Sequence, residues 1–296
     1  MPDRATLVAF GTFVLIGGVN FVAVRFSNRE LAPMFGAGVR FTVAALILLA
    51  LVALRRLPVA RGRALKAAVI YGLLNFTAAY GLAYWALTTL PAGIGAVLFA
   101  ATPLFTVFLA PLHGIEKFRV RGLVGSLITL VGIVILANPT GTDRLPWLSL
   151  LAMLGSAAAA AEAGVVLKLL PSAHPISTNA VAMAIGGPLL LGASGLIGES
   201  WALPAETETW VAVSYLAVIG SVGLFGLFLF VLRRWSATGT SYATALIPVI
   251  TVIVGSLLAS EAITLPMVIG GAIVLGGVYI GALARSPDET AASVTV

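Results

Sequence analysis

The sequence contains no cysteine, and only 9% of its 296 residues are charged. The lack of cysteine excludes disulfide bonds and thiolate metal sites. The scarcity of charge excludes a water-soluble globule, because soluble domains carry about 25% charged residues. Hydrophobic residues make up 60% of the chain, so we expect an all-α integral membrane protein surrounded by the lipid bilayer.

Apolar stretches long enough to cross a membrane recur along the chain. A hydrocarbon core about 30 Å thick needs roughly 20 apolar residues per helix. The first stretch has no convincing signal-peptide cleavage site, so we expect it to remain in the mature protein. We predict ten transmembrane helices, at residues 5–24, 31–54, 64–87, 92–112, 121–137, 147–170, 176–197, 208–232, 238–258 and 264–284.

Lys and Arg residues gather on one side of this series of helices. That side holds Arg4, Arg55, Arg56, Arg61, Arg63, Lys66, Lys117, Arg119, Arg121, Lys168, Arg233, Arg234 and Arg285. The opposite side holds Arg25, Arg29 and Arg144, and Arg40 lies within a helix. Loops rich in Lys and Arg stay in the cytoplasm, so we expect both termini to be cytoplasmic. The net charge of +6 is then a topology signal, and we expect no nucleic-acid partner.

The stretch from Ala92 to Ala137 has a second copy, from Ala237 to Gly281. One offset pairs Pro103 with Pro248, Ala100 with Ala245, Thr106 with Thr251, Glu116 with Glu261, Gly125 with Gly270 and Gly132 with Gly277. We therefore predict two five-helix repeats, at residues 1–145 and 146–285, followed by a disordered cytoplasmic tail at 286–296. An odd number of helices inverts the second repeat. Inverted repeats are common in transporters that bind substrate near the bilayer midplane.

Motifs of other functional classes are missing. The chain has no P-loop and no G-x-S-x-G elbow, and its two histidines, His113 and His174, have no partner at metal-ligand spacing. Asp occurs only at positions 3, 143 and 288, outside the predicted helices. We expect no cofactor, no metal and no ATP hydrolysis. An intramembrane enzyme, and a channel, lipid scramblase or structural subunit, remain the alternatives to a carrier.

The run YWALTTLPAGIGAVLFAATPLFTVFLAPLHGIEKF and its second copy, SYATALIPVITVIVGSLLASEAIT, resemble the EamA repeat of the drug/metabolite transporter (DMT) superfamily. GGVNFVAVR and the VRF around Arg40 resemble the first two helices of that family. The general likeness is greatest to the YddG-like bacterial exporters of aromatic amino acids and related cations. The resemblance implies a secondary-active exporter of small organic metabolites in the bacterial inner membrane, working by alternating access. A nucleotide-sugar or lipid-precursor carrier is the alternative; exact cargo, coupling and oligomeric state, monomer or homodimer, stay open.

Aromatic residues of the third predicted helix are the candidates for contact with a small-molecule substrate. Phe76, Tyr80 and Tyr84 are spaced i, i+4 and i+8 on one helical face, with Asn75 and Trp85 at its flanks. Rings with a polar tip suit a planar or amphipathic solute; a packing stripe is the alternative. Further candidates for the cavity are Asn20, Phe99 and Tyr242.

Two ionisable residues lie within predicted helices, where contact with lipid is costly. Glu162, in AAAAAEAGVVL, is expected to face the interior. Its carboxylate could pair with a substrate ammonium, carry a proton or bond a neighbouring helix. Arg40 lies too deep to reach the interface easily, so it either pairs within the protein or serves function.

Prolines and glycines mark the helices that bend and pack closely. Pro103 and Pro248 each remove a backbone hydrogen bond in mid-span, which predicts a kink that forms a hinge or shapes a cavity. The glycines predicted to give smooth faces for helix contact include Gly125, Gly132, Gly270, Gly277 and Gly281.

Overall fold

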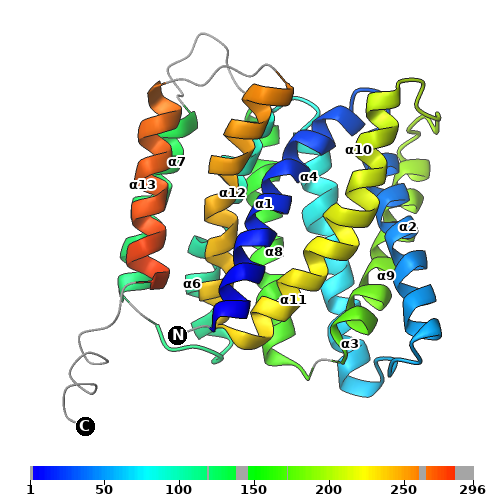
Figure 1. Cartoon of the computed structure of the whole chain (residues 1–296), viewed down its shortest axis with the longest axis horizontal. Coiled ribbons are helices and arrows are strands. Elements are labelled where there is room, and N and C mark those ends of the chain that lie inside the picture. Colours follow the sequence, from blue (N-terminus) through cyan, green and yellow to red (C-terminus); the bar gives the residue numbers. More distant parts are fainter. Residues whose placement is uncertain (1–2, 119, 138–145, 172, 260–264, 284–296) are drawn as a thin grey trace.

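The computed structural model describes residues 3–118, 120–137, 146–171, 173–259 and 265–283, which form a bundle of helices (Figure 1). The predicted tail at 286–296 lies outside these residues. The elements are α1 (Arg4–Ser27), α2 (Pro33–Leu54), α3 (Gly62–Tyr71), η1 (Gly72–Ala79), α4 (Tyr80–Ala86), α5 (Ala92–Phe99), α6 (Thr102–Leu112), α7 (Val120–Ala137), α8 (Trp147–Leu169), α9 (Pro175–Leu196), α10 (Thr207–Ala217), η2 (Val218–Gly223), α11 (Leu224–Arg234), α12 (Ala237–Leu258), α13 (Leu265–Val278) and η3 (Tyr279–Leu283), where η denotes a π-helix.

Eight helical stretches are long and apolar enough to cross a bilayer, and two shorter apolar helices cover 120–135 and 268–281. These ten stretches coincide with the ten predicted spans. The third span is continuous through α3, η1 and α4, and the eighth through α10, η2 and α11. Both spans therefore carry a π-helix at the same place in their repeat. The all-α fold predicted from composition is confirmed.

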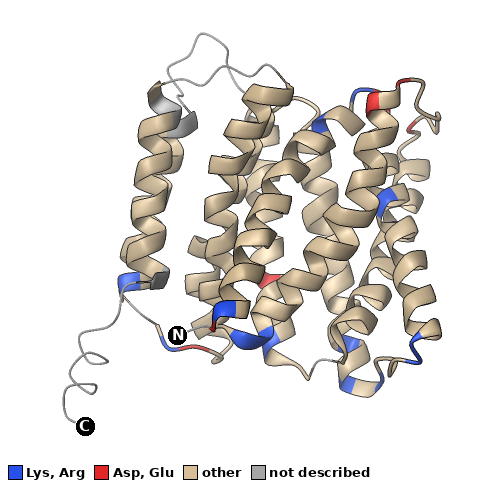
Figure 2. Ribbon diagram, in the orientation of Figure 1, with Lys and Arg blue, Asp and Glu red and all other residues tan. Residues whose placement is uncertain are grey.

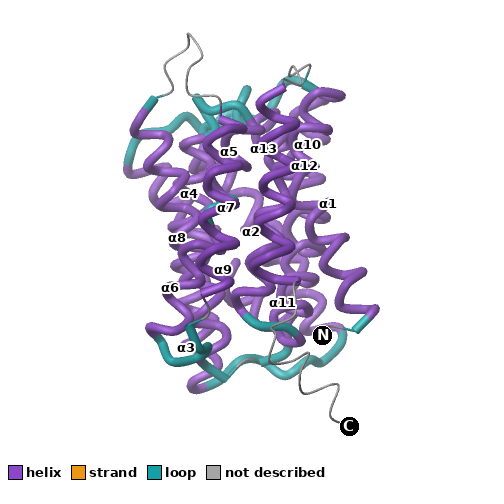
Figure 3. Tube along the Cα trace, turned by 90° about the vertical axis from the view of Figure 1, so that its left-hand side faces the viewer, coloured by secondary structure: helices purple, strands orange, loops and turns teal. Residues whose placement is uncertain are grey.

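The helices of the two repeats interlock reciprocally. In the first repeat α1 packs against α10, α11 and α12 of the second, and α8 of the second repeat packs against α3, η1, α4, α5 and α6 of the first. Equivalent spans also pair with each other, because α2 packs along α9 and α7 along α13 (Figures 1 and 3). These contacts thus recur with the repeats exchanged, as two inverted five-helix repeats require.

Glycines let α7 and α13 approach closely. A Cβ added to Gly125 would lie 2.6 Å from the Gly281 Cα and 2.7 Å from the Gly277 carbonyl oxygen. One added to Gly132 would lie 2.8 Å from the Gly270 carbonyl oxygen. The five glycines predicted to serve packing therefore meet at one interface between the repeats, where backbone lies against backbone.

Positive charge is concentrated at one end of the bundle. Figure 2 shows most Lys and Arg residues at the end where α1 begins, with few at the opposite end. This distribution agrees with the Lys and Arg pattern of the sequence. It supports a cytoplasmic location for the N-terminal end, which stays a prediction.

Glutamates join the two repeats at the end of the bundle opposite the N-terminus. Glu199 accepts hydrogen bonds from the backbone N–H groups of Met34 (3.2 Å) and Phe35 (2.9 Å), at the start of α2. Glu30 in turn accepts hydrogen bonds from residues 205–206, just before α10. Carboxylates at helix N-termini are favourable because they satisfy free N–H groups and oppose the helix dipole.

The Glu30 contact is expected to persist at neutral pH. Hydrogen bonds from Thr209 and from the backbone N–H of Ala205 lower the pKa of Glu30 below its ordinary value of 4.5. Because the pKa is lower in the folded state than in the unfolded chain, the charged carboxylate stabilises the contact fully at pH values above the ordinary pKa of 4.5. The contact is lost only as the pH falls through the lowered value.

The cap at α2 predicts a measurable effect on stability. Glu199→Ala should lower the free energy of unfolding by about 1 kcal/mol, because it leaves two N–H groups of α2 without an acceptor. The matched control is Glu208→Ala, since Glu208 forms an exposed pair with Arg29 at 3.3 Å and exposed pairs contribute little. Thermal denaturation in detergent measures both. Equal shifts for the two variants would contradict a specific role of Glu199.

Candidate functional site

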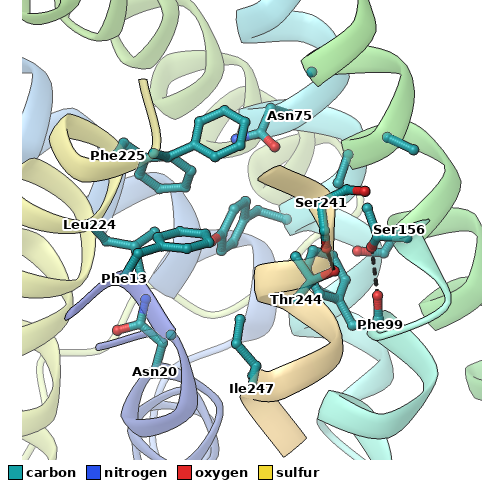
Figure 4. Close-up of a pocket in the computed structure, with 18 of the residues that line it drawn as sticks. Phe13, Asn20, Asn75, Phe99, Ser156, Leu224, Phe225, Ser241, Thr244 and Ile247 are labelled. Atoms are coloured by element: carbon teal, nitrogen blue, oxygen red, sulfur yellow. Dashed lines mark hydrogen bonds between the residues drawn. The ribbon is translucent and has the colours of Figure 1, made fainter. Parts of the chain in front are cut away.

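A cavity lies in the middle of the bundle, between the two repeats. Its volume is about 90 Å³, enough for several water molecules, since one needs about 10–15 Å³. The first repeat lines it from α1, α2, η1, α4, α5 and α6, and the second from α8, α11 and α12 (Figure 4). A site at the interface of inverted repeats is where transporters of this architecture bind substrate.

Aromatic and amide side chains give the cavity a mixed surface. The Phe99 ring lies 5.8 Å from the Phe21 ring on one wall, and the Tyr80 ring 5.7 Å from the Phe225 ring on another. Such walls suit a flat or apolar group of a solute. Of the residues predicted from sequence, those in the lining are Asn20, Arg40, Asn75, Tyr80, Tyr84 and Phe99.

The π-helix η1 changes which residues share a face with Tyr80. An α-helix would align Phe76 with Tyr80, but η1 covers Gly72–Ala79 and its repeat is one residue longer. Asn75, five residues before Tyr80, therefore lines the cavity. Phe76 is fully buried behind the lining, with its ring 4.6 Å from Phe225 and 4.9 Å from Phe41.

Two further aromatic candidates also lie outside the lining. Tyr242 is buried, and its hydroxyl donates a hydrogen bond to the Gly122 carbonyl oxygen at 3.1 Å and lies 3.3 Å from the Ser126 hydroxyl. It therefore ties α12 to α7. The Trp85 side chain is 39% exposed on the outer surface of the bundle, where a membrane protein meets lipid.

Glu162 lies beside the cavity without lining it. The cavity face of α8 carries Ser156, Ala160, Ala161 and Gly164, and an α-helix turns about 100° per residue, so Glu162 points to a different side. Its Oε1 lies 3.0 Å from the Nε2 atom of His113, at the end of α6. The partner that the sequence left open is thus a histidine of the other repeat.

Arg40 is held at the cavity wall by the second repeat. Its side chain is fully buried. The Nε atom donates to the Ser221 hydroxyl at 2.8 Å, Nη2 to the Gly220 carbonyl oxygen at 2.7 Å, and Nη1 to the Tyr84 hydroxyl at 3.2 Å. The Asn20 Nδ2 atom donates to the same Gly220 oxygen at 3.0 Å. The π-helix η2 therefore positions two polar residues of the first repeat.

Sequence reasoning missed several polar residues of the second repeat. Ser221 holds Arg40, and Ser156, Ser241 and Thr244 line the cavity. Their position inside apolar spans could have identified them, because a hydroxyl group there needs a hydrogen-bond partner or a polar cavity. Ser241 and Thr244 also share one helical face, by their spacing of three residues.

The two matched prolines have different surroundings. Pro103 lies in the first turn of α6, after a break in the fourth span at residues 100–101. A proline is well tolerated there because the first N–H groups of a helix have no intrahelical acceptor. Pro248 lies inside the continuous helix α12, where it leaves the carbonyl oxygen of Thr244, a cavity residue, without its usual donor.

Proteins that are named as transporters or efflux pumps match this chain over most of its length. The uncharacterized inner membrane transporter YedA of Escherichia coli (strain K12) is 32% identical over 269 residues, which cover 89% of this chain and 87% of that protein. A protein of the same organism named "Probable amino-acid metabolite efflux pump" is 22% identical over 279 residues, which cover 90% of this chain and 91% of that protein.

A solved crystal structure shares the fold, with a TM-score of 0.75 at 18% identity, covering 99% of this chain and 100% of that one. The model of the EamA-like transporter family matches residues 5–138 and again residues 147–282. Both matches coincide with the repeats of the structure. The likeness to YddG-like exporters stays a prediction. The chain therefore belongs to the EamA-like transporter family of the DMT superfamily, and it is a multi-pass membrane transporter and not an enzyme.

Proposed function

We propose that this transporter is a secondary-active exporter of the bacterial inner membrane, with both termini in the cytoplasm. Its cargo is small organic metabolites, with aromatic and other amino acids favoured. It binds one solute molecule in the central cavity and exposes the cavity alternately to the two sides of the membrane. The observation that carries the proposal is the cavity itself, which both repeats line with aromatic side chains and the first repeat also with amide groups.

The chemistry of the lining supports an amphipathic cargo. Phe21, Phe99 and Phe225 offer apolar surface, while Asn20 and Asn75 offer amide groups. Among the described lining residues, Arg40 is the one charged side chain. A positive wall without a carboxylate disfavours cationic solutes, so we narrow the predicted cargo from amino acids and related cations to amino acids.

Contacts at both ends of the bundle support alternating access. At one end Glu199 and Glu30 join the repeats, as described above. At the other end Glu116 accepts hydrogen bonds from the backbone N–H groups of Ala237 (2.5 Å) and Thr238 (3.3 Å), at the start of α12. Each set consists of only a few hydrogen bonds. Rocking of one repeat against the other can therefore break and remake them.

Transport by the purified protein tests this proposal. Proteoliposomes are loaded with labelled phenylalanine, threonine, a cationic drug or a nucleotide sugar, and efflux is followed with and without a pH gradient. We expect phenylalanine efflux above that of protein-free liposomes, and a smaller effect for the drug. Efflux of the nucleotide sugar alone would favour the alternative carrier. Efflux of none of the four would overturn the proposal.

A further inference from the structure

Arg40 is a buried charge whose partners are neutral. Its three acceptors are two hydroxyl groups and a backbone carbonyl oxygen. No carboxylate of the described residues forms a salt bridge with Arg40: Glu208 lies beside Arg29, and Glu162 lies beside His113. An unpaired charge inside a membrane protein is costly and often marks a substrate site. The rings of Phe41, Tyr80 and Tyr84 lie 4.9, 5.0 and 6.0 Å from its Cζ atom and attract the cation, but they carry no negative charge, so the site can still receive an anionic group from outside the chain.

The guanidinium group also has donors to spare. It carries five N–H groups, of which three have the acceptors given above. One N–H on each terminal nitrogen is left without an acceptor among the described residues. A guanidinium binds a carboxylate through both oxygens when an N–H on each of two nitrogens points toward it, and Arg40 has one N–H to offer on each terminal nitrogen. The bond to the Tyr84 hydroxyl is the longest of the three, at 3.2 Å, and is the one that a carboxylate would most easily replace.

Two amide side chains of the lining each have one atom without a partner. The Asn20 and Asn75 side chains are 5% and 7% exposed. Neither the Asn20 Oδ1 atom nor the Asn75 Nδ2 atom has a hydrogen-bond partner. The Asn20 assignment is fixed by its Nδ2 atom, which donates to the Gly220 carbonyl oxygen. Buried amide atoms without a partner are rare and costly, so the cavity offers one free acceptor and one free donor beside the cation.

We propose that Arg40 receives the carboxylate of the cargo, and that the cargo is an α-amino acid with an apolar or aromatic side chain. The Asn75 Nδ2 atom donates a second hydrogen bond to the carboxylate, and the Asn20 Oδ1 atom accepts one from the ammonium group. The aromatic walls hold the side chain. This inference rests on the proposed function and specifies what the cargo must carry. A ligand needs a carboxylate to bind, and a ligand with an ammonium group alone does not bind.

The test measures binding to the purified protein in detergent by isothermal titration calorimetry. The ligands are phenylalanine, 3-phenylpropionate, which has the carboxylate alone, and 2-phenylethylamine, which has the ammonium alone. Wild-type protein should bind the first two and not the third. Arg40→Met should weaken the binding of both carboxylates by about 30-fold, and Arg40→Lys by less, because lysine keeps the charge but loses the paired donors.

Arg25→Met is the matched control. The Arg25 Nη1 atom donates to the Leu90 carbonyl oxygen, and Arg25 is absent from the cavity lining, so affinity should not change. If Arg40→Met fails to fold, the three ligands on wild-type protein still decide. Binding of 2-phenylethylamine as tightly as phenylalanine, or no binding of either carboxylate, overturns the inference.

The binding and transport assays separate the two proposals. Carboxylate-dependent binding without phenylalanine efflux would retain the role of Arg40 and overturn the exporter. If 2-phenylethylamine inhibited phenylalanine efflux as strongly as 3-phenylpropionate does, the exporter would be retained and the role of Arg40 would be overturned.

Discussion

Leucine in place of Gly125 will lower the free energy of unfolding by about 3 kcal/mol. The first added carbon would lie 2.6 Å from the Gly281 Cα atom, well inside van der Waals contact. The obstacle is backbone, which cannot rotate away as a side chain can. Helices α7 and α13 would have to separate, and the contact between the last spans of the two repeats would be lost. The melting temperature in detergent and the yield of monodisperse protein measure this loss.

The control is Gly271→Leu, on the same helix pair. Nothing lies within 4 Å of a Cβ added to Gly271, so this variant adds the same atoms to α13 without a clash. Its melting temperature should stay close to that of the wild-type protein. If both variants melted at the wild-type temperature, the close packing of α7 on α13 would be wrong.

Tryptophan in place of Ala160 will reduce transport by about tenfold or more. Ala160 lies on α8 in the lining of the cavity, and the indole would take up space that the cargo needs. The helix itself should be little affected, because the added group has a cavity to enter. Phenylalanine efflux from proteoliposomes measures the loss, and the melting temperature shows whether the protein is folded.

Leu151→Trp tests whether the position of the indole matters. Leu151 lies on the same helix and is 56% exposed on the outer surface of the bundle. An indole there should leave efflux near the wild-type rate, since large apolar side chains are compatible with lipid. Efflux by the Ala160 variant at the rate of the Leu151 variant would place the cargo path elsewhere.

The fold could be predicted because its signals are long and redundant. Ten apolar stretches, the Lys and Arg asymmetry and the matched positions around Pro103 and Pro248 each point to the same inverted repeats. A bilayer admits few alternatives, because every backbone polar group inside it must find a partner within the protein. Composition and spacing were therefore sufficient for the helices and their number.

The cavity residues were harder to predict, because single turns of helix decide them. The alignment of Phe76 with Tyr80 assumed an α-helix, and η1 replaced Phe76 with Asn75. Local sequence gives no clear sign of a π-helix, which depends on tertiary packing. Likewise, Glu162 lies against His113, and the partner of a carboxylate far away in sequence cannot be read from spacing.

The most direct test of the account asks whether the central cavity opens to both sides of the membrane and holds the cargo. The chain has no cysteine, so Thr244→Cys places a single thiol in the cavity lining. A membrane-impermeant thiol reagent is applied to right-side-out and to inside-out vesicles. We predict labelling in both, slowed in both by phenylalanine. Labelling from one side only, or at a rate that phenylalanine does not change, would contradict a cargo site exposed alternately between the two repeats.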